Sequence, residues 1–442
     1  MTSFTVVFLF LNAMALLGLP RHLAPLPLLV GCCYMTASES FNLGPIHCTV
    51  IRVLIAVGIA RALMRGERVA GCMLGMDKLM IAWMVWIVLS SPLFPGTESP
   101  LVFNLGQAFN IGGIYFLIRV FCATLDDLIG ITKLAAWLLA PIGIEMVTEH
   151  LTHNNLFSVF GAFLSVRDEK FRSQGPFAHP ILAGSVGATC FPLMIGIWQR
   201  SRGVAVVGLV SCLAMVAACN SSGPIMSLVF GICALAMWPR RALTRYAGRT
   251  FVAAYLILNM VMKRPAYYVI GEIDLTGSST GWHRARLIES SIEHLNEWWL
   301  AGTDHTRHWM ATGVSCSPNH TDITNYYLLM GIWAGLPLVA LFMLMIWFGF
   351  RYVGRIIRQP ESSEQGEAFM VWCLGAALFA HMATCISVAY FDQSFIFMFL
   401  CMAATSSLYV AVKQRSKDSE QIANATGNAP EPASALAATY GL

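Results

Sequence analysis

Apolar blocks long enough to cross a membrane as helices recur along almost the whole chain of 442 residues. A transmembrane helix needs about 20 predominantly apolar residues to cross a hydrocarbon core of about 30 Å. Because 57% of the residues are hydrophobic and only 12% are charged, the pattern excludes a soluble domain and predicts a polytopic α-helical membrane protein. The first block, Ser3–Leu19, lacks the basic start and small-residue cleavage site of a signal peptide, so we expect it to be a span.

The blocks predict an all-α bundle of 12–13 transmembrane helices over residues 1–412. Leu23–Met35 and Thr250–Met262 are short for a core of about 30 Å, which leaves the number open between twelve and thirteen. Residues 413–442 follow the last block, and their composition predicts a disordered cytoplasmic tail. The predicted spans are Ser3–Leu19, Leu23–Met35, Ile46–Leu63, Leu79–Phe94, Leu101–Ala123, Leu128–Val147, Pro180–Trp198, Gly203–Cys219, Ser222–Trp238, Thr250–Met262, Ile323–Phe350, Ala368–Ala389 and Phe395–Val412.

Lysine and arginine are concentrated in alternate short loops of this arrangement. Cytoplasmic loops carry an excess of these residues, so we expect this set of loops and the C-terminus to be cytoplasmic. Two long loops, about 148–179 and 263–322, are then periplasmic. The cytoplasmic set comprises Arg61, Arg65, Arg68, Lys78, Arg200, Arg202, Arg240, Arg241, Arg245, Arg249, Arg351, Arg355, Arg358, Lys413, Arg415 and Lys417.

Both long loops nevertheless carry basic residues, on the side of the membrane that the charge bias disfavours. Binding of an anionic ligand would explain these cations, although long loops also tolerate charge without a function. The net charge of +4 is mild and does not indicate a nucleic-acid surface. The external cations are Arg167, Lys170, Arg172, Lys263, Arg264, Arg284, Arg286 and Arg307.

The segment Thr280–Leu300 of the second long loop has the spacing of an amphipathic helix. We expect it to lie on the membrane surface or to cap the bundle. Arg284 and Arg286 fall in its first turn, where cations oppose the helix dipole but can bind a phosphate group together with free amides. A phosphate site and a solvated helix end both remain open. The predicted apolar face comprises Leu287, Ile288, Ile292, Leu295 and Trp299.

His320 directly precedes the predicted helix that starts near Ile323, and Asp322 and Asn325 are close to it in the sequence. A histidine can act as a base near neutral pH, and a neighbouring carboxylate can orient it. A histidine in a loop can equally be an ordinary surface residue. A metal site can be imagined from four residues, but their spacing fits no standard ligand pattern, so we expect no metal. These four are Asp304, His305, His308 and His320.

The first long loop ends in the segment Arg172–Pro180, which contains His179. Gly175 and Pro176 predict a turn there, and the turn would direct Arg172 back over the bundle. In the third span, Arg52 lies near the outer end; it is either functional, as intramembrane arginines often are, or it reaches to the outer surface. On the face of another span, three amides predict hydrogen bonds between helices: Asn104, Gln107 and Asn110.

Three motifs in this order resemble the O-antigen ligase and O-antigen polymerase family, which includes exopolysaccharide polymerases. The first is Arg172–Gly184, RSQGPFAHPILAG, which is similar to the family's R-x-x-G-x-x-x-H-P entry to a helix. The second is Arg284 followed by the amphipathic helix and a glycine, here Gly302. The third is His320, eleven residues before Gly331, which is similar to the family's H-N/S-x-x-L…G-x-x-G signature.

The chain departs from this family pattern at three places. Thr321 follows the histidine where asparagine or serine is usual, and Trp298-Trp299 stand where the family has His-Pro. Gly331 and Gly335 are four residues apart rather than three. The run HTDITNYYLLMG looks closer to the exopolysaccharide branch than to ligases, so the departures bear on the substrate more than on the reaction.

The resemblance implies a metal-independent, inverting glycosyltransferase without a cofactor, on the periplasmic face of the bacterial inner membrane. It would transfer a glycan from an undecaprenyl-diphosphate-linked oligosaccharide donor to an acceptor sugar, and so polymerise exopolysaccharide or O-antigen repeat units. His320 would be the base, and Arg172 and Arg284 would stabilise the diphosphate. Further substrate contacts are expected from Arg286, Arg307, Asp322, Asn325, Arg52 and His179. Membrane lipid and a chain-length regulator protein are candidate partners, and nucleic acid is not.

Two other functions stay open. One is an O-antigen ligase, which would transfer finished polymer to lipid A-core. The other, of a different class, is a transporter or flippase for a lipid-linked sugar. Such transporters usually contain internal repeats, and here no repeat is visible and the two long loops are asymmetric, so we favour the enzyme.

Overall fold

The computed structural model describes residues 1–94, 100–162, 165–167, 170–269, 281–311, 314–359 and 365–425. Nearly all regular structure is helical, as the apolar blocks predict. The α-helices are α1 (Ser3–Gly18), α2 (Pro25–Tyr34), α3 (Val50–Arg65), α4 (Gly75–Leu89), α5 (Leu101–Phe121), α6 (Leu125–Thr152), α7 (Pro180–Gly196), α8 (Arg202–Ala218), α9 (Ser222–Ala236), α10 (Ala247–Val261), α12 (Gly281–Glu293), α13 (Leu295–Trp298), α14 (Tyr326–Ile357), α15 (Gln365–Cys385) and α16 (Phe395–Ala425). Short 3₁₀ helices are η1 (Arg21–Leu23), η2 (Ser91–Leu93), η3 (Leu156–Phe160), η4 (Trp238–Tyr246), η5 (Ala266–Tyr268) and η6 (Arg307–Met310).

Each predicted span overlaps a helix of this set, from α1 to α10 and from α14 to α16, although Ile46–Thr49 at the start of the third predicted span form a strand. Within the described residues, five helices are long and apolar enough to cross a membrane: α5, α6, α14, α15 and α16. A sixth is counted if α9 and η4, which meet at an angle of 98°, form one broken span. The chain is therefore a multi-pass helical protein, while the number of 12–13 crossings stays a prediction.

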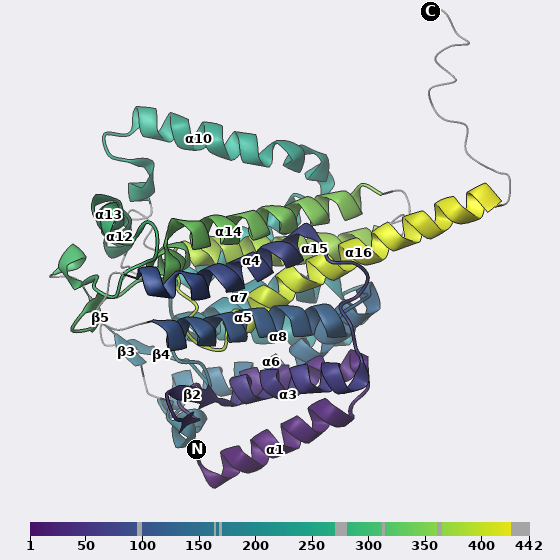
Figure 1. Cartoon of the computed structure of the whole chain (residues 1–442), viewed down its shortest axis with the longest axis horizontal. Coiled ribbons are helices and arrows are strands. Elements are labelled where there is room, and N and C mark those ends of the chain that lie inside the picture. The colour runs from purple at the N-terminus through teal and green to yellow at the C-terminus, as the bar shows by residue number, and fades with distance from the viewer. Residues whose placement is uncertain are drawn as a thin grey trace, which may run out of the picture.

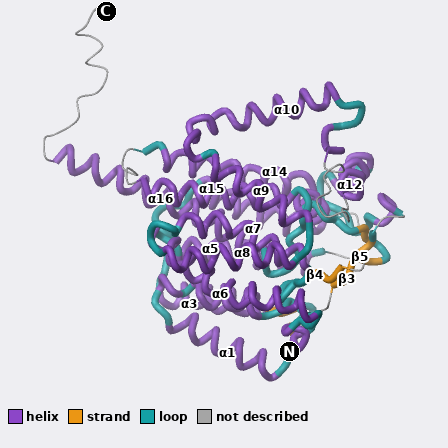
Figure 2. Tube along the Cα trace, turned by 180° about the vertical axis from the view of Figure 1, so that it is seen from behind, coloured by secondary structure: helices purple, strands orange, loops and turns teal. Residues whose placement is uncertain are grey.

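The few strands form three antiparallel hairpins, all at one end of the helical bundle (Figures 1 and 2). We call this the hairpin end; α12 and α13 lie there too, whereas α16 projects from the opposite end, the tail end. Hairpins β3–β4 and β5–β6 are close to each other in both views. The strands are β1 (Ser40–Leu43), β2 (Ile46–Thr49), β3 (Ser165–Arg167), β4 (Lys170–Arg172), β5 (Ser315–Ser317) and β6 (His320–Thr321).

The bundle is built around α7, which packs against α8, α9 and α15, while α8 also packs against α6. Its core is one continuous hydrophobic cluster that runs from α1 to α16. By contrast, α10 lies apart along one side in both views, and its main contacts are with its own flanking elements, η4 and η5. All of the described α10 side chains are exposed, as expected for an apolar helix that faces lipid.

One ion pair is completely buried within the bundle. Arg119 on α5 donates from Nε to Asp77 Oδ1 on α4 at 2.9 Å and from Nη2 to Asp77 Oδ2 at 3.0 Å. Tyr115 donates to the same carboxylate at 2.7 Å, and Ser407 on α16 accepts from Arg119 Nη1 at 2.9 Å. The pair is thus bidentate and hydrogen-bonded, which is what burial of two charges requires.

Arg52 ties α3 to the polar face of α5. Its Nε donates to Asn110 Oδ1 at 3.0 Å, and its Nη1 donates to the His47 carbonyl in β2. On the same face of α5, Asn104 donates to the Ser91 hydroxyl at 3.0 Å. These contacts confirm the predicted hydrogen bonds between helices for two of the three amides, and they give Arg52 a structural role.

The predicted disordered tail is wrong for its first part. Helix α16 continues past Val412, the expected end of the span, as far as Ala425. The added residues include Lys, Gln, Arg, Glu and Ala, which have high helix propensity, so the helix extends beyond its apolar part. The remainder of the predicted tail, 426–442, lies outside the described residues.

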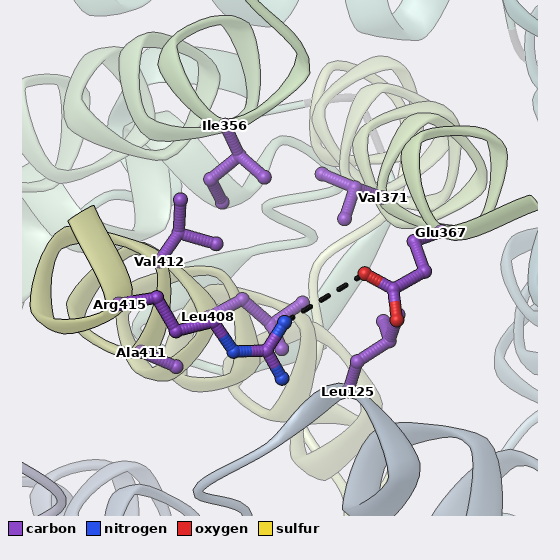
Figure 3. A pocket seen from close by; sticks show the side chains of 8 residues that line it. All are labelled: Leu125, Ile356, Glu367, Val371, Leu408, Ala411, Val412 and Arg415. Atoms are coloured by element: carbon purple, nitrogen blue, oxygen red, sulfur yellow. Dashed lines mark ion pairs between the residues drawn. The ribbon is translucent and has the colours of Figure 1, made fainter. Parts of the chain in front are cut away.

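At the tail end, a small cavity lies between α6, α14, α15 and α16 (Figure 3). Arg415 and Glu367 form an ion pair of 3.8 Å beside it. Its volume of about 30 Å³ has room for water but not for a sugar.

Candidate functional site

Arg172 closes the hairpin β3–β4 and is buried, with 7% of its surface exposed. Its Nε lies 3.5 Å from the carbonyl oxygen of Cys219, at the C-terminal end of α8. The next amide, Ser173 N, donates to the Ala218 carbonyl at 3.2 Å. The first motif is thus bound to the turn between α8 and α9, and Arg172 points back over the bundle as predicted.

The loop after Arg172 is held by a carboxylate from the bundle. Glu149 Oε2, on the last turns of α6, accepts the backbone amides of Gln174 at 3.0 Å and Gly175 at 2.9 Å. The predicted turn is present: Gly175 has a φ of +55°, and Phe177 N donates to the Gln174 carbonyl at 3.2 Å. A left-handed φ at this position favours glycine, which explains its place in the motif.

The same loop is held from its other side by the connection between α15 and α16. Asp392 Oδ2 accepts the Ala178 amide at 2.9 Å, and Gln393 Nε2 donates to the Pro176 carbonyl at 3.2 Å. Asp392 and Gln393 are themselves buried. Two separate parts of the bundle therefore fix the backbone that carries Arg172, and the arginine is preorganised.

The second long loop folds into a compact unit with a small core of its own. We call residues 281–311 and 314–325 the outer cap. Its core is formed by Leu287, Trp298, Trp309 and Met310, and Ile332 of α14 completes it. The outer cap is thus fixed on the first turns of α14, at the hairpin end of the bundle.

The predicted amphipathic helix is shorter than expected. The helix ends at Glu293, and after His294 a separate short helix, α13, begins; Thr280 lies outside the described residues. Ile292, Leu295 and Trp299 are exposed. The buried face of α12 includes Leu287 and four polar residues, and the Asp322 carbonyl just after β6 is the hydrogen-bond partner of His283. The four polar residues are His283, Arg284, Ser290 and Ser291.

Arg284 and Asp322 lie near each other in the outer cap. Arg284 is 8% exposed and Asp322 is half-buried. Burial raises the pKa of the Asp322 carboxyl above its ordinary value and outweighs the opposing effects of His283 and Arg284. His283 Nε2 lies 3.0 Å from the Asp322 carbonyl oxygen, which can only accept, so this nitrogen carries the proton.

Two motifs are brought into contact where the outer cap meets α14. The helix is broken at Ala334 and Gly335, whose φ values are −159° and +77°. Thr303 N donates to the Ile332 carbonyl at 3.0 Å, and Leu336 N donates to the Trp299 carbonyl at 2.7 Å. The segment around Gly302 therefore satisfies backbone groups that the break leaves free, as membrane-embedded backbone requires.

His320, at the start of β6, is half-buried, and its Nδ1 lies 2.8 Å from the Ser317 hydroxyl. Among the described side chains, Ser317 rather than Asp322 is the hydrogen-bond partner that orients the ring. A hydroxyl can donate or accept, so this contact is compatible with either neutral tautomer of the imidazole.

Two candidate residues cap helices. Asn325 Oδ1 accepts the amides of Tyr327 at 2.9 Å and Leu328 at 3.1 Å at the start of α14. His179 Nδ1 accepts the Ile181 amide at 3.2 Å at the start of α7. Both therefore fix helix N-termini at the hairpin end.

The two remaining cations bind within the outer cap. Arg286 pairs with Glu289 and, at 3.5 Å, with Glu293. Arg307 donates to the carbonyl of Met310 at 3.2 Å and to that of Ala311 at 2.6 Å. Both guanidinium groups therefore have partners within the cap, and the Arg307 amide, which donates to the Asn319 carbonyl at 3.0 Å, holds η6 beside the hairpin that carries His320. The candidate site comprises Arg172, Arg284, Asp322 and His320.

Among the residues that the structure describes, one group of three could hold a metal ion: His294, Glu297 and His308. The metal set imagined from the sequence shares only His308 with this group. The difference arises because the turn at α13 brings His294 and Glu297 next to His308 on η6. The spacing of residues along the chain does not reveal this contact.

Sequence reasoning missed the residues that hold the first motif. Glu145 and Glu149 lie one helical turn apart at the end of an apolar block, and Asp392 follows another block. Carboxylates at the ends of membrane helices are costly unless they have partners. Their cost could therefore have identified all three as residues with partners that hold the first motif in place.

No protein-family model matches the chain, and no curated protein matches it either.

Proposed function

We propose that the protein transfers a glycan from a polyprenyl-diphosphate donor to an acceptor sugar at the hairpin end of the bundle. More specifically, we propose that it is a metal-independent polymerase of exopolysaccharide or O-antigen repeat units. It would lie in the inner membrane, with the hairpin end in the periplasm. The resemblance of the three motifs supports the reaction class, and the Lys and Arg distribution supports the orientation.

The observation that carries the proposal is the convergence of the three motifs at one end of the bundle. Arg172 ends β4 and His320 begins β6, and these hairpins lie close together (Figures 1 and 2). Arg284 belongs to the outer cap, which contacts α14 through Gly302. Two buried arginines from different loops and one histidine are the groups that such a transfer needs.

The chemistry assigns a role to each group. Breaking the bond between sugar and phosphate develops negative charge on the diphosphate, and fixed guanidinium groups stabilise that charge. The acceptor hydroxyl must lose its proton as it attacks, and His320 accepts the proton.

Ser317 has a positioning role in this scheme. For Nε2 of His320 to act as the base, Nδ1 must carry the proton and donate it to the Ser317 hydroxyl at 2.8 Å. Without this contact the His320 ring is still present, but it can also adopt the tautomer with the proton on Nε2, in which Nε2 cannot act as the base. Ser317→Ala should therefore lower kcat less than His320→Ala does.

The test is transfer by the purified full-length protein in lipid or detergent. A polyprenyl-diphosphate-linked repeat unit should be converted into longer lipid-linked chains, with release of polyprenyl diphosphate. A folded, membrane-inserted protein that leaves every such donor unchanged, with acceptor present, would contradict the proposal.

A deletion strain separates polymerase from ligase. For a polymerase, we expect single repeat units or no exported polymer after the deletion. If long chains instead accumulate on the carrier lipid and are missing from lipid A-core, the protein is a ligase.

A further inference from the structure

A group of metal-ligand side chains in the outer cap takes no part in the proposed transfer. The ligand atoms of His294, Glu297 and His308 all lie within 4.8 Å of one another. His294 and Glu297 belong to the corner between α12 and α13, whereas His308 belongs to η6, eleven residues further on. The three side chains thus join two separate parts of the cap.

The surroundings orient His294 as a metal ligand. Its Nδ1 lies 2.8 Å from the carbonyl oxygen of Ser290, which can only accept a hydrogen bond. The proton of the neutral ring is therefore on Nδ1, and Nε2 has a free lone pair. A backbone carbonyl that holds the far nitrogen of a histidine in this way is the usual support of zinc-binding histidines.

The carboxylate is held in the same manner. Trp309 Nε1 donates to Glu297 Oε2 at 2.9 Å, and His308 Nε2 lies 2.9 Å from the same oxygen. The indole is buried in the core of the cap and stacks on the His294 ring, with centroids 5.7 Å apart. One rigid side chain therefore positions two of the three ligands.

We propose that His294, Glu297 and His308 bind one Zn²⁺ ion that joins the corner between α12 and α13 to η6. Two imidazoles and one carboxylate form a known ligand set for zinc, with water in the fourth position. Ligands of a tetrahedral zinc ion with bonds of about 2.1 Å are about 3.4 Å apart, so small side-chain rotations suffice to close the site. Magnesium prefers oxygen ligands and does not fit.

The proposal is independent of glycan transfer, because it concerns binding and stability of the cap. The full-length protein is purified in detergent, stripped with a chelator and titrated with Zn²⁺ against a chromogenic competitor. We expect one ion per chain and a higher Tm with Zn²⁺ but not with Mg²⁺. Co²⁺ in place of Zn²⁺ should give the visible absorption of a four-coordinate ion.

Matched variants localise the ion. Glu297→Gln and His308→Ala should lose zinc binding, and both are mild substitutions at partly exposed positions. Trp309→Phe keeps a ring but removes the donor to Glu297, so the affinity should fall about 10- to 100-fold. His305→Ala is the control, because His305 stacks on His308, with centroids 5.0 Å apart, but is not one of the three ligands.

Two results would overturn the proposal. One is a wild-type protein that binds no more zinc than the Glu297→Gln and His308→Ala variants. The other is loss of binding in His305→Ala equal to that in His308→Ala, which would point to nonspecific binding by histidines of the loop.

Discussion

The backbone amide of Leu336 donates a 2.7 Å hydrogen bond to the carbonyl oxygen of Trp299, across the break in α14. This bond replaces the one that the helix loses where Ala334 and Gly335 leave helical geometry. Trp86 Nε1 from α4 satisfies the Ala334 carbonyl at 2.8 Å. The backbone groups at the break are therefore satisfied by the outer cap on one side and by helix α4 on the other.

Gly302→Ala and Gly335→Ala should each destabilise the protein by about 2–4 kcal/mol. Both glycines have positive φ, and a Cβ at either would overlap a carbonyl oxygen, that of Ile332 or Leu300. Thermal unfolding in detergent measures the effect. Gly130→Ala is the matched control, because a Cβ there meets nothing within 4 Å and alanine favours a helix. Equal Tm values for all three variants would contradict this account.

The role of His320 predicts that His320→Ala lowers transfer by about 10²–10⁴-fold while lipid-linked donor still binds. A base acts in the reaction step, so the loss should appear in kcat. Steady-state kinetics and donor binding by the purified variant are the measurements. A His320→Ala protein that is folded, inserted and fully active would remove the base from the mechanism.

The arginines should behave differently from each other. Arg284→Lys should lower kcat by about 10²–10³-fold, because an ammonium does not reproduce two parallel contacts to phosphate oxygens. Arg172→Ala should weaken donor binding itself. Arg241→Ala, which removes an exposed guanidinium stacked on Trp238, is the control for loss of charge alone. Full activity of Arg284→Lys would contradict bidentate binding.

Asp322 predicts a pH-dependent contribution to stability. Burial raises its pKa above the ordinary value of 3.8, so the folded state holds the proton more tightly than the unfolded state. The cost of the buried charge is thus absent below pH 3.8, grows as the pH rises from 3.8 to the folded pKa, and is constant above it. Relative to wild type, Asp322→Asn should therefore gain stability as the pH rises from 3.8 to the folded pKa. A difference in Tm that does not change with pH would contradict this.

The arginine-based scheme predicts that Mg²⁺ and Mn²⁺ do not accelerate transfer. The protein is stripped with EDTA, resupplied with Zn²⁺ for the outer cap, and assayed with and without added Mg²⁺ or Mn²⁺. Equal rates are expected, because fixed guanidinium groups balance the charge of the leaving diphosphate. If Mg²⁺ restores a lost activity, stabilisation by arginine alone is insufficient.

The orientation can be checked with a membrane-impermeant thiol reagent. Cys72 is exposed in the connection between α3 and α4, where lysine and arginine predict the cytoplasm. A cysteine introduced by Asn319→Cys lies in the exposed turn between β5 and β6. From the periplasmic side, the reagent should label the residue 319 thiol and not Cys72. The reverse pattern would invert the topology and remove the proposed site from the periplasm.

Much of the fold could be predicted from the sequence because membrane helices have a local signal. A continuous apolar block specifies a helix without reference to its partners, so every predicted span overlaps one, although Ile46–Thr49 at the start of the third span form a strand. The face of α12 could not be predicted in this way. Its His283 is buried with a partner, the Asp322 carbonyl, from 39 residues further along the chain, and no local pattern contains that information.

The candidate site could be predicted only as separate motifs. The resemblance identifies Arg172, Arg284 and His320. In the structure, Gly302 of the second motif lies against the backbone of α14, and Gly335 of the third motif lies against the backbone of the outer cap. The partners that fix these motifs, such as Glu149 and Ser317, are set by the tertiary structure. Likewise, the sequence predicts a phosphate contact for Arg286 because it lies in the same helical turn as Arg284. In the structure, two glutamates on its own helix bind it.

The buried pair of Asp77 and Arg119 has a consequence for biosynthesis. Asp77 lies in the first turn of α4 and Arg119 in the last turn of α5, and either charge alone would cost free energy on entering the lipid. Because α4 and α5 are consecutive helices, the two charges can neutralise each other while both segments are still held by the insertion machinery. We therefore expect these two helices to enter the bilayer together as a hairpin, before α16 arrives from the ribosome to complete the network at Ser407.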